Sequence, residues 1–495
     1  MPVPALRIQE LNAAPIRRDG EFVLYWMIAS RRPHYNFALE RAVAVASELQ
    51  KPLLVLEALR SDYPWASDRL HRFVLGGMAD NQAAFAKTNA LYYPYVEPER
   101  GAGKGLIEAL AQHAALIVTD DFPCFFLPRM VRAAAERSRI RVESVDSNGI
   151  VPLRAVDRAY SRAFDFRRFL SRVLPEHAAA TPLANPLKGA RLPAPPSLSK
   201  QQSQRWPQAS AELLALDGAA LARLPVNHRV GPGAQSGGFR AARKRLDDFL
   251  AHKLEKFADE RNHPDSNGAS GLSASLHFGH LSAHEAFTRV LALEQLTVHD
   301  LQGRSQGEPK TLWQMRPGAE TFLDQLVTWR ELGYNFCHHR PNDYDQFDAL
   351  PNWAKATLSA HQRDPRERYT PAQLESAETG DELWNAAQRE LVESGQLHGY
   401  LRMLWGKRVL TWLDDPREAF SLLIELNNKY ALDGRNPNSY SGISWCFGRY
   451  DRPWPERKIF GTVRAMTSDS ARRKLHLTEY LSRWGKSRTP RLPGL

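Results

Sequence analysis

The sequence predicts an α/β domain with a doubly wound parallel sheet, followed by an all-helical domain. From Glu21 to about residue 147, continuous apolar runs alternate with amphipathic helical patterns. From Pro175 to Gly238 the composition turns to Pro, Ala, Ser and Gly, which is typical of a poorly ordered connection between domains. Beyond that stretch the apolar residues recur at helical spacing. We therefore expect domains at residues 1–174 and 239–495, joined by residues 175–238.

About five segments of the first domain have the continuous apolar character of buried strands. They are FVLYWMIAS, PLLVLEAL, ALYYPYVEP, ALIVTDD and RVESVDS, separated by helix-like segments such as NFALERAVAVASELQ and RLHRFVLGGMADNQAAFAKT. Such an alternation indicates a parallel sheet covered on both faces. The GAGKG motif at 101–105 matches neither the Walker spacing nor the dinucleotide fingerprint. We expect it to form a turn before a helix and assign it no site.

Helical periodicity dominates from Phe239 onward. In FRAARKRLDDFLAHKLEKFADERN, apolar residues from Phe239 to Phe257 recur at helical intervals, with basic residues opposite them. The next segment, SGLSASLHFGHLS, places small hydroxyls and glycines before a helix expected to begin near Ser282. Unpaired amides at a helix start suit phosphate oxygens, although a serine-rich helix cap explains the same residues.

Length and charge narrow the classes of partner. The 495 residues suffice for two or three domains, and a formal charge of +11 with a pI near 9.5 favours an anionic partner such as nucleic acid. Solubility alone is the alternative explanation of that charge. No stretch approaches about 18 consecutive apolar residues, and no secretory signal is recognisable. We expect a cytoplasmic protein without membrane contact, and a monomer.

Cysteine and histidine give no convincing metal site. The three cysteines are far apart, which argues against a disulfide framework, and they are too few to ligate an iron–sulfur cluster. His277, His280 and His284 invite a zinc interpretation, since the last two are four residues apart on a predicted helix. No carboxylate or thiol completes the set, so we predict no metal.

Three tryptophans mark the region from Asp381 to Trp445. Trp384, Trp405 and Trp412 fall on two predicted consecutive helices, and Trp405 precedes Trp412 by two helical turns. His398 and Arg402 share that stripe, which makes the predicted surface too polar for a simple core. Core packing is still the usual use of tryptophans at helical spacing, and it is the alternative.

The amino-acid sequence of this region closely resembles the sequences of a known family. WNAAQRELVESGQLHGYLRMLWGKRVLTWL, LNNKYALDGRNPNSYSGISW and KIFGTVRAM are similar to the signature segments of class II cyclobutane-pyrimidine-dimer photolyases. The resemblance extends more loosely over nearly the whole chain. It implies an FAD enzyme that repairs ultraviolet-damaged DNA with light. It also implies an amino-terminal antenna domain that can hold a second chromophore, of unknown identity, near the carboxyl edge of the sheet.

The resemblance assigns a set of cofactor residues. The pyrophosphate of FAD would lie in the segment formed by Ser270, Gly271, Leu272 and Ser273. The remaining matches are Phe257, where relatives usually carry Tyr, the basic Arg261, Asn427 beside the redox-active ring nitrogen, and Arg402 paired with Asp433 against the isoalloxazine. Taken alone, that last pair could be an ordinary buried ion pair.

The same resemblance assigns the tryptophans as an electron relay to the flavin. Trp405 would be the member next to the flavin, Trp384 the middle member and Trp412 the solvent-side member. Trp405 follows Trp384 by 21 residues and precedes Trp412 by 7, and both spacings match the class II arrangement.

The predicted substrate face differs from the family pattern at one position. Trp329 and Trp445 match aromatic residues that support the flipped lesion, and Met403 matches a residue that touches its bases. The dimer-repairing relatives generally carry Glu four residues before that first tryptophan, whereas this chain has Gln325. Glutamine offers a donor and an acceptor but no proton to give.

That difference keeps several functions open. A cryptochrome-like photoreceptor and a (6-4) photolyase are alternatives, because some of both carry Gln at the equivalent place. The chain continues only as KLHLTEYLSRWGKSRTPRLPGL, so we expect no long signalling tail. A flavin-independent DNA-binding protein is a third alternative. The predicted contacts to DNA phosphates, each with a solvated helix face as its alternative, are Arg240, Arg243, Lys244, Arg472, Arg473 and Lys474.

Overall fold

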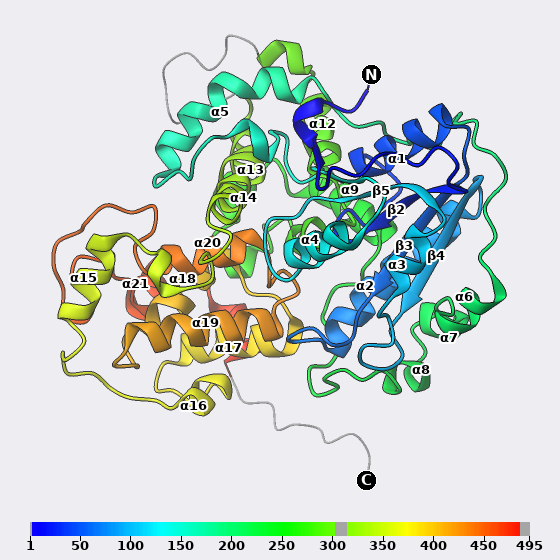
Figure 1. Ribbon diagram of the computed structural model, residues 1–495. Helices are drawn as coiled ribbons and strands as arrows, with labels where there is room; N and C mark the ends of the chain where they lie inside the picture. The colour runs from blue at the N-terminus through cyan, green and yellow to red at the C-terminus, as the bar shows by residue number, and fades with distance from the viewer. Residues whose placement is uncertain (1, 302–313, 486–495) are drawn as a thin grey trace.

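A six-stranded sheet forms the amino-terminal half of the protein (Figure 1). The computed structural model describes residues 2–301 and 314–485. The strands are β1 (Ile8–Glu10), β2 (Phe22–Met27), β3 (Leu53–Leu59), β4 (Ala90–Val96), β5 (Ala114–Asp120) and β6 (Val142–Val145). Their order is β1-β6-β5-β2-β3-β4, and all neighbours are parallel except β1, which pairs antiparallel with β6.

The five predicted strands are confirmed as β2 to β6, and β1 is the strand that the sequence did not reveal. Its three residues carry no apolar run, since two of them are solvent-exposed. The covering helices are α1 (Phe37–Glu48), α2 (Asp68–Phe85), α3 (Leu106–Ala111) and α4 (Leu127–Arg137). Alternate residues of β2 pack against α1 on one face and against α3 and α4 on the other, so both faces are covered.

The strand order changes direction between β2 and β5, which is the topological switch point of the sheet. Asp120, the last residue of β5, fixes the loop that follows β2. Its Oδ2 accepts hydrogen bonds from the amides of Ile28, Ala29 and Ser30 at 2.8, 2.8 and 2.9 Å. Its Oδ1 accepts from the Tyr25 hydroxyl at 2.8 Å. The carboxyl edge of the sheet is therefore rigidly built at that point.

The segment predicted as a poorly ordered connection contains short helices. They are α6 (Lys200–Arg205), α7 (Ala211–Leu214) and α8 (Gly218–Ala222), preceded by α5 (Ala163–Ala178), which runs through the expected boundary at residue 174. A side-chain oxygen caps the start of each of the three short helices, which favours helix despite the Pro- and Ser-rich composition. Trp206 packs on the sheet half, while the Ala234 amide donates to the Ser394 carbonyl in the helical half at 2.8 Å.

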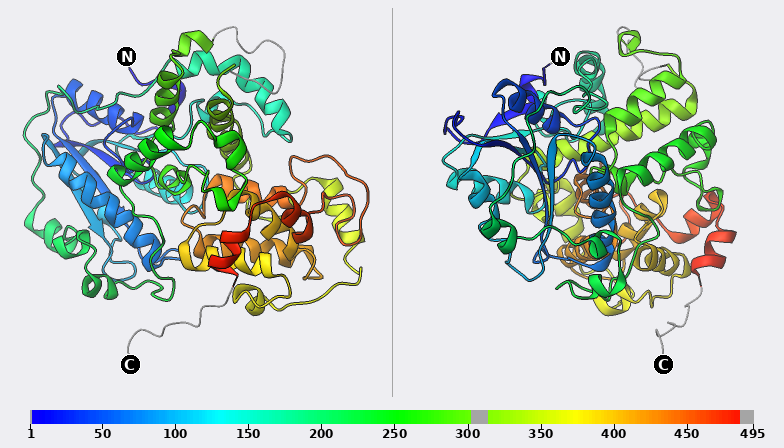
Figure 2. Two further views of the ribbon diagram at one scale, coloured as in Figure 1. Left: turned by 180° about the vertical axis from the view of Figure 1, so that it is seen from behind. Right: turned by 90° about the vertical axis from the view of Figure 1, so that its right-hand side faces the viewer.

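The described part of the carboxy-terminal half is helical (Figure 2). Its helices are α9 (Phe239–His252), α10 (Phe257–Glu260), α11 (Ser273–His277), α12 (Ala283–Leu293), α13 (Pro317–Leu323), the π-helical η5 (Asp324–Trp329), α14 (Arg330–His339), α15 (Asn352–Ala360), α16 (Pro371–Glu375), α17 (Glu382–Ser394), α18 (Gly399–Val409), α19 (Pro416–Tyr430), α20 (Pro437–Cys446), α21 (Ser468–Lys474) and α22 (Thr478–Trp484). Single 3-10 turns occur at η1 (Ala5–Arg7), η2 (Leu153–Ala155), η3 (Pro264–Ser266), η4 (Val298–Leu301) and η6 (Phe347–Ala349). Within the described residues, no helix is both long and apolar enough to cross a membrane.

The periodic segment that starts at Phe239 does not form one continuous helix. Helix α9 ends at His252, and the chain turns before the short α10. Leu254 and Phe257 nevertheless stay buried in the same core as Phe249. The apolar spacing predicted their burial correctly but not the break. Ser282 caps α12, so the helix expected near Ser282 is confirmed.

Arg69 of α2 ties the sheet half to the helical half. Its guanidinium donates to the carbonyls of Leu391, Val392 and Glu393 at the end of α17, and to that of Tyr430 at the end of α19, at 2.7 to 3.2 Å. A fifth bond reaches Gly231 at 3.0 Å. A cation at two helix carboxyl ends satisfies orphan carbonyls and complements both helix dipoles.

Candidate functional site

The three predicted relay tryptophans lie inside the core of the helical half. Trp384 is on α17 and Trp405 is on α18, and their exposed fractions are 0% and 1%. Helix α18 ends at Val409, so Trp412 lies in the turn beyond it and is 2% exposed. The expectation of a polar helix face shared by Trp405 and Trp412 was therefore wrong, because the helix ends between them.

Contacts within the core connect these tryptophans. The rings of Trp384 and Trp412 meet edge to face with centroids 5.0 Å apart. The Trp384 indole N–H donates to the backbone carbonyl of Trp405 at 2.9 Å. The Trp405 indole N–H donates to Oε1 of the buried Gln388 at 2.8 Å, which fixes the orientation of its ring. The structure thus brings the three residues together, whereas their roles stay predictions.

Trp412 does not reach solvent itself. The guanidinium of Arg408 lies 4.7 Å from its ring centroid, and the ring of Tyr369 meets it edge to face at 5.5 Å. Trp412 was predicted as the solvent-side member of the relay, but its own ring is buried. Its neighbours Arg408 and Tyr369 are half-buried.

Arg402 joins two of the predicted cofactor residues. Its Nη2 donates to Asp433 Oδ1 at 2.8 Å, and its Nη1 lies at 3.4 Å from Asn427 Oδ1. Burial raises the pKa of Asp433, but the charge and hydrogen bond of Arg402 and a hydrogen bond from Ser273 outweigh it, so the pKa is lowered overall. The carboxylate is therefore ionised. The Nδ2 atom of Asn427 is buried and has no protein acceptor.

The loop from Ser270 to Ser273 reaches the same place. Gly271 has φ of +66°, a conformation that favours glycine, and its carbonyl accepts from Gln235 Nε2 at 3.0 Å. The loop leads into α11, whose first residue, Ser273, is hydrogen-bonded to Asp433. Four predicted cofactor residues from three separate segments, Ser273, Arg402, Asn427 and Asp433, are thereby assembled.

Two other predicted cofactor residues have different surroundings. Phe257 is 5% exposed and packs edge to face against Phe249 and Phe322 at 5.3 and 5.8 Å. This is a core position. Arg261 is partly buried, which lowers its pKa, and its guanidinium lies 5.9 Å from the Phe257 ring. Half-buried His398, just before α18, lies against the backbone of Arg261, so that segment does approach the helix of Arg402.

The two predicted lesion-supporting tryptophans stack on each other. The rings of Trp329 and Trp445 are 4.7 Å apart with an interplanar angle of 11°. Nothing flat fits between rings at that distance, so they form one platform and not two facing walls. Both are half-buried. The sulfur of Met403 on α18 is 4.0 Å from Sγ of Cys446, which follows Trp445. The structure brings these three residues to one region.

Gln325 lies in η5, the π-helical stretch between α13 and α14. Here the amide of Arg330 bonds back to the carbonyl of Gln325, a separation of five residues. Single π turns are rare in proteins, and those that occur often lie at functional sites. Gln325 and Trp329 therefore share an unusual backbone segment, which the residue pattern did not predict.

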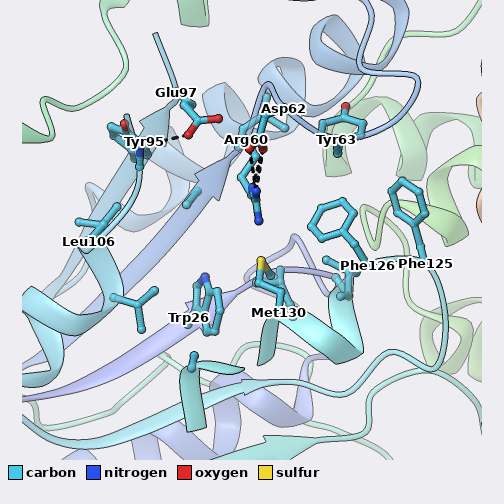
Figure 3. Close-up of a pocket in the computed structure, with 18 of the residues that line it drawn as sticks. Trp26, Arg60, Asp62, Tyr63, Tyr95, Glu97, Leu106, Phe125, Phe126 and Met130 are labelled. Atoms are coloured by element: carbon cyan, nitrogen blue, oxygen red, sulfur yellow. Dashed lines mark hydrogen bonds and ion pairs between the residues drawn. The ribbon is translucent and has the colours of Figure 1, made fainter. Parts of the chain in front are cut away.

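A second candidate site is a cavity of about 600 Å³ at the carboxyl edge of the sheet (Figure 3). Residues that follow β2, β3 and β5 line it, so it lies beside the switch point. In Figure 3, Trp26 and Met130 lie opposite Arg60 and Asp62, which form an ion pair at 2.7 Å. Its Trp, Tyr and Phe lining consists of Trp26, Tyr63, Tyr95, Phe122, Phe125, Phe126 and Phe278.

The GAGKG segment borders this cavity. Gly101, Gly103, Lys104 and Gly105 line it, and the segment turns into α3 as predicted. Oε1 of Glu97 accepts from the Gly103 amide at 3.0 Å, while its Oε2 accepts from the Ser61 amide at 2.9 Å. Glu97 thus ties two loops of the cavity together. The residue pattern assigned this motif no site, and the carboxyl-edge rule for open sheets accounts for its position beside the cavity.

The histidines have protein partners in place of a ligand cluster. His277 contacts the Asn436 amide at 3.0 Å, and His280 accepts from the Gly238 amide at 2.9 Å. Among residues 2–301 and 314–485 there is no group of three or more His, Cys, Asp or Glu that could hold a metal ion.

The predicted DNA-contact cations differ in availability. Arg243 is engaged by Glu285 at 2.6 Å, and Arg472 contacts Glu382 at 2.9 Å. Arg240 is exposed but lies 3.6 Å from the carboxylate of Asp80, and Lys244, Arg473 and Lys474 are exposed. Their role in DNA binding stays a prediction.

Comparison with known proteins identifies the family. No family model matches the chain. The chain is 35% identical to the deoxyribodipyrimidine photo-lyase of Methanothermobacter thermautotrophicus, over 97% of this chain and 98% of that relative. It is 33% identical to the protein of the same name from Oryza sativa subsp. japonica, over 94% and 88%. The chain belongs to the deoxyribodipyrimidine photo-lyase family.

A solved photolyase shares the fold. The crystal structure of a bacterial class III photolyase from Agrobacterium tumefaciens matches with a TM-score of 0.62 at 18% identity, over 91% of this chain and 83% of that one. The predicted fold, a parallel α/β sheet followed by a helical region, is thereby confirmed. The chain is an enzyme of the photolyase family, whereas the relatives do not assign it to class II.

The family implies an FAD cofactor, and the assembled residues of this photolyase fit one. A buried donor without a partner costs about 1–3 kcal/mol, so the free Nδ2 of Asn427 favours an occupant that accepts a hydrogen bond. In this orientation the amide offers its Nδ2 as a donor, because its Oδ1 already faces Arg402 Nη1 at 3.4 Å. The Arg402–Asp433 pair is 23% and 19% exposed, so a bound ring could still cover it.

Some residues that support the photolyase site were not predicted from the sequence. Gln388 orients Trp405, and Asp324 accepts from the Trp329 indole at 3.0 Å. Arg167 of α5 in turn binds Asp324 from a position 157 residues earlier. No local pattern marks the pairing of Arg167 with Asp324 or of Gln388 with Trp405.

Proposed function

We propose that this photolyase repairs cyclobutane pyrimidine dimers in DNA and is of class II type, with FAD as its cofactor. The observation that carries the proposal is the position of Arg402. It bonds Asp433 and lies within reach of Asn427, and it precedes Trp405 by three residues on α18. The residues assigned to the flavin and to the relay therefore meet on one helix.

The cofactor would be held by residues of the helical half. Bound, reduced FAD supplies the excited electron that splits the dimer and that returns afterwards. Ser270, Gly271, Leu272 and Ser273 would offer amides and hydroxyls to its phosphates. Arg402 and Asp433 would lie against the ring system, with Asn427 presenting its amide. Arg261 and Phe257 would border the same cofactor.

The three core tryptophans would carry an electron inward. Trp412 would receive it, Trp384 would pass it on across the 5.0 Å ring contact, and Trp405 would be the last member. Their burial excludes water from the route, which keeps the charge from being lost to solvent.

The lesion would leave the duplex and lie on the tryptophan platform. Photolyases are among the known base-flipping enzymes, and a damaged pair costs less to extrude than an intact one. Trp329 and Trp445 together offer an extended aromatic face, and stacking typically contributes about 1–3 kcal/mol per base. Met403 would touch the bases, and Gln325 would hydrogen-bond their carbonyls and N–H groups.

Gln325 favours a second candidate function. Because some (6-4) photolyases and cryptochromes carry Gln at the equivalent place, repair of (6-4) photoproducts or cryptochrome-like light sensing is the competing proposal. The decisive experiment illuminates flavin-reduced wild type and Gln325→Glu with an oligonucleotide that contains either a thymine dimer or a (6-4) product.

We expect wild type to repair the dimer and Gln325→Glu to repair it about tenfold faster, which corresponds to about 1.4 kcal/mol of barrier. The substitution Gln362→Glu, made at an exposed turn, controls for the added charge. Equal inactivity of wild type and Gln325→Glu on both lesions would favour the photoreceptor.

We further propose that the cavity at the carboxyl edge binds an antenna pigment. Its seven Trp, Tyr and Phe side chains and its volume of about 600 Å³ suit a planar heteroaromatic ring. The variant Ala134→Trp would fill part of it, since Ala134 lines the cavity.

We expect wild type incubated with flavin mononucleotide, a folate or a deazaflavin to retain one of them at equimolar amounts, measured by absorbance after gel filtration. Ala134→Trp should retain none while its FAD content is unchanged. Failure of wild type to retain any of the three would contradict the antenna proposal.

The proposed functions follow the predicted domains. Residues 1–174 would form the antenna domain, residues 175–238 the connection, and residues 239–495 the domain that binds FAD and DNA. A monomer in the cytoplasm stays the expected state of the protein.

A further inference from the structure

Each indole of the tryptophan platform is held by a carboxylate. The Trp445 N–H donates to Asp451 Oδ1 at 3.0 Å, and the Trp329 N–H donates to Asp324 Oδ2 at 3.0 Å. An indole N–H is a single donor, so such a bond fixes the direction in which the ring lies in its plane. The stacked geometry is thus set by two hydrogen bonds in addition to ring contact.

The bond within η5 depends on the π turn. Asp324 and Trp329 are five residues apart, and in an α-helix the side chains that meet are three or four apart. A π turn bonds residue i to residue i+5, which brings these two positions onto the same side. The π-helical backbone therefore explains how Asp324 reaches the Trp329 ring.

A cation from a distant helix fixes Asp324 in turn. Arg167 of α5 donates from Nε and Nη2 to Asp324 Oδ1 at 3.1 and 3.0 Å, and from Nη2 to Oδ2 at 3.0 Å. The two side chains are only 18% and 24% exposed, so solvent competes weakly for this forked pair. The negative charge of Asp324 also acts on Arg261.

We infer that Arg167 and Asp324 are positioning residues that set the selectivity of the platform for a flipped damaged pair. The inference rests on the proposed repair function and names how its substrate face is built. The chain of contacts runs from the Arg167 guanidinium through the Asp324 carboxylate and the Trp329 N–H to the Trp445 ring. Removing either charged residue frees the Trp329 ring to leave the stack.

Asp324 does not replace the carboxyl group that Gln325 lacks. Both of its oxygens already accept hydrogen bonds, Oδ1 from Arg167 and Oδ2 from Arg167 and Trp329. A carboxylate with these partners has its charge compensated within the protein. Its contribution to recognition is therefore the orientation of Trp329, and Gln325 remains the polar group offered to the lesion.

The test measures the dissociation constants for an oligonucleotide with one thymine dimer and for its undamaged copy. Asp324→Asn and Arg167→Gln break the pair, and Trp329→Phe keeps a ring but removes the donor. Each should lower the ratio of damaged to undamaged affinity about tenfold, the factor that 1.4 kcal/mol represents. Flavin content and melting temperature, measured on the same samples, should equal those of wild type.

Two controls separate orientation from charge. Arg417→Gln removes one cation from an exposed ion pair with Asp348 and should leave the ratio unchanged. Asp324→Asn removes a negative charge, which by itself would tighten binding to any DNA. A lower ratio together with unchanged or tighter binding of undamaged DNA therefore identifies the positioning role. The double variant should lose no more than either single variant, because both act on one ring.

Different results would overturn the positioning role and the proposed repair function. If wild type prefers the damaged oligonucleotide and Asp324→Asn and Trp329→Phe keep that preference, the positioning role is overturned while repair stands. If wild type itself shows no preference, the proposed function and the inference fall together. If Asp324→Asn melts at a lower temperature than wild type, the deciding measurement is the affinity ratio of Trp329→Phe, because this variant leaves the ion pair intact.

Discussion

Replacing Trp405 by Phe is expected to abolish the light-driven reduction of oxidised flavin. Phenylalanine fills most of the same volume but has no readily oxidised indole. It also loses the 2.8 Å bond to Gln388. Trp384 and Trp412 would keep their ring contact at 5.0 Å but lose the last member of the relay. We expect photoreduction to slow by at least ~100-fold, as a barrier raised by about 3 kcal/mol would give. The measurement is flavin absorbance under blue light with an external reductant.

Repair by chemically prereduced Trp405→Phe should match that of wild type, because the relay is not used once the flavin is reduced. Trp206→Phe is the matched control. Trp206 is also buried, at 3% exposure, and also donates its N–H, in this case to the Ala102 carbonyl at 3.1 Å, but it lies in the sheet half. Unchanged photoreduction in Trp405→Phe would eliminate the relay assignment.

The substitution Asp433→Asn should release the flavin. It leaves Arg402 without its carboxylate, and the bound cofactor would cover that cation, which is 23% exposed in the structure described above. Orphaning one member of a buried pair typically costs about 3–5 kcal/mol. A cost near 3 kcal/mol weakens binding by roughly 10²-fold. The flavin-to-protein ratio after gel filtration measures the loss.

Acidity provides a second readout of the same pair. The pKa of Asp433 is lowered in the folded protein, so its stabilising contribution is fully present above its ordinary pKa of 3.8 and is lost as the pH falls through the lower folded value. Wild type should therefore retain flavin at pH 5. The exposed ion-pair variant Asp348→Asn is the control. Full flavin retention by Asp433→Asn would show that the pair does not hold the cofactor.

The strands were predictable because buried parallel strands are continuous apolar runs. Strand β1 was not, since two of its three residues face solvent and its pairing with β6 joins residues 133 or more positions apart. The end of α18 was also missed. The sequence that follows Val409, LTWLDDP, has no Gly at the helix end, and its Pro comes only at Pro416. The spacing of the residues therefore predicted a helix that extended to Trp412.

Much of the candidate site could be predicted from the resemblance, because the matched motifs assemble in space. Ser273, Arg402, Asn427 and Asp433 meet although they come from separate segments. The stacking of Trp329 on Trp445 and the forked bond of Arg167 to Asp324 could not be predicted. Each joins residues more than a hundred positions apart, and the π turn that aligns Asp324 with Trp329 has no residue signature.

The hydrogen bonds of Arg69 couple the stability of the helical half to that of the sheet half. One side chain from the sheet half closes the ends of α17 and α19, the helices that carry Trp384 and Asn427. If the helical half were cut free, four carbonyls at those ends would lose their shared donor, at a cost of about 1–3 kcal/mol for each that stayed shielded from water. The helical half, which would hold the flavin, is therefore stabilised in part by the sheet half. The two halves would have different functions, but we expect them to unfold together.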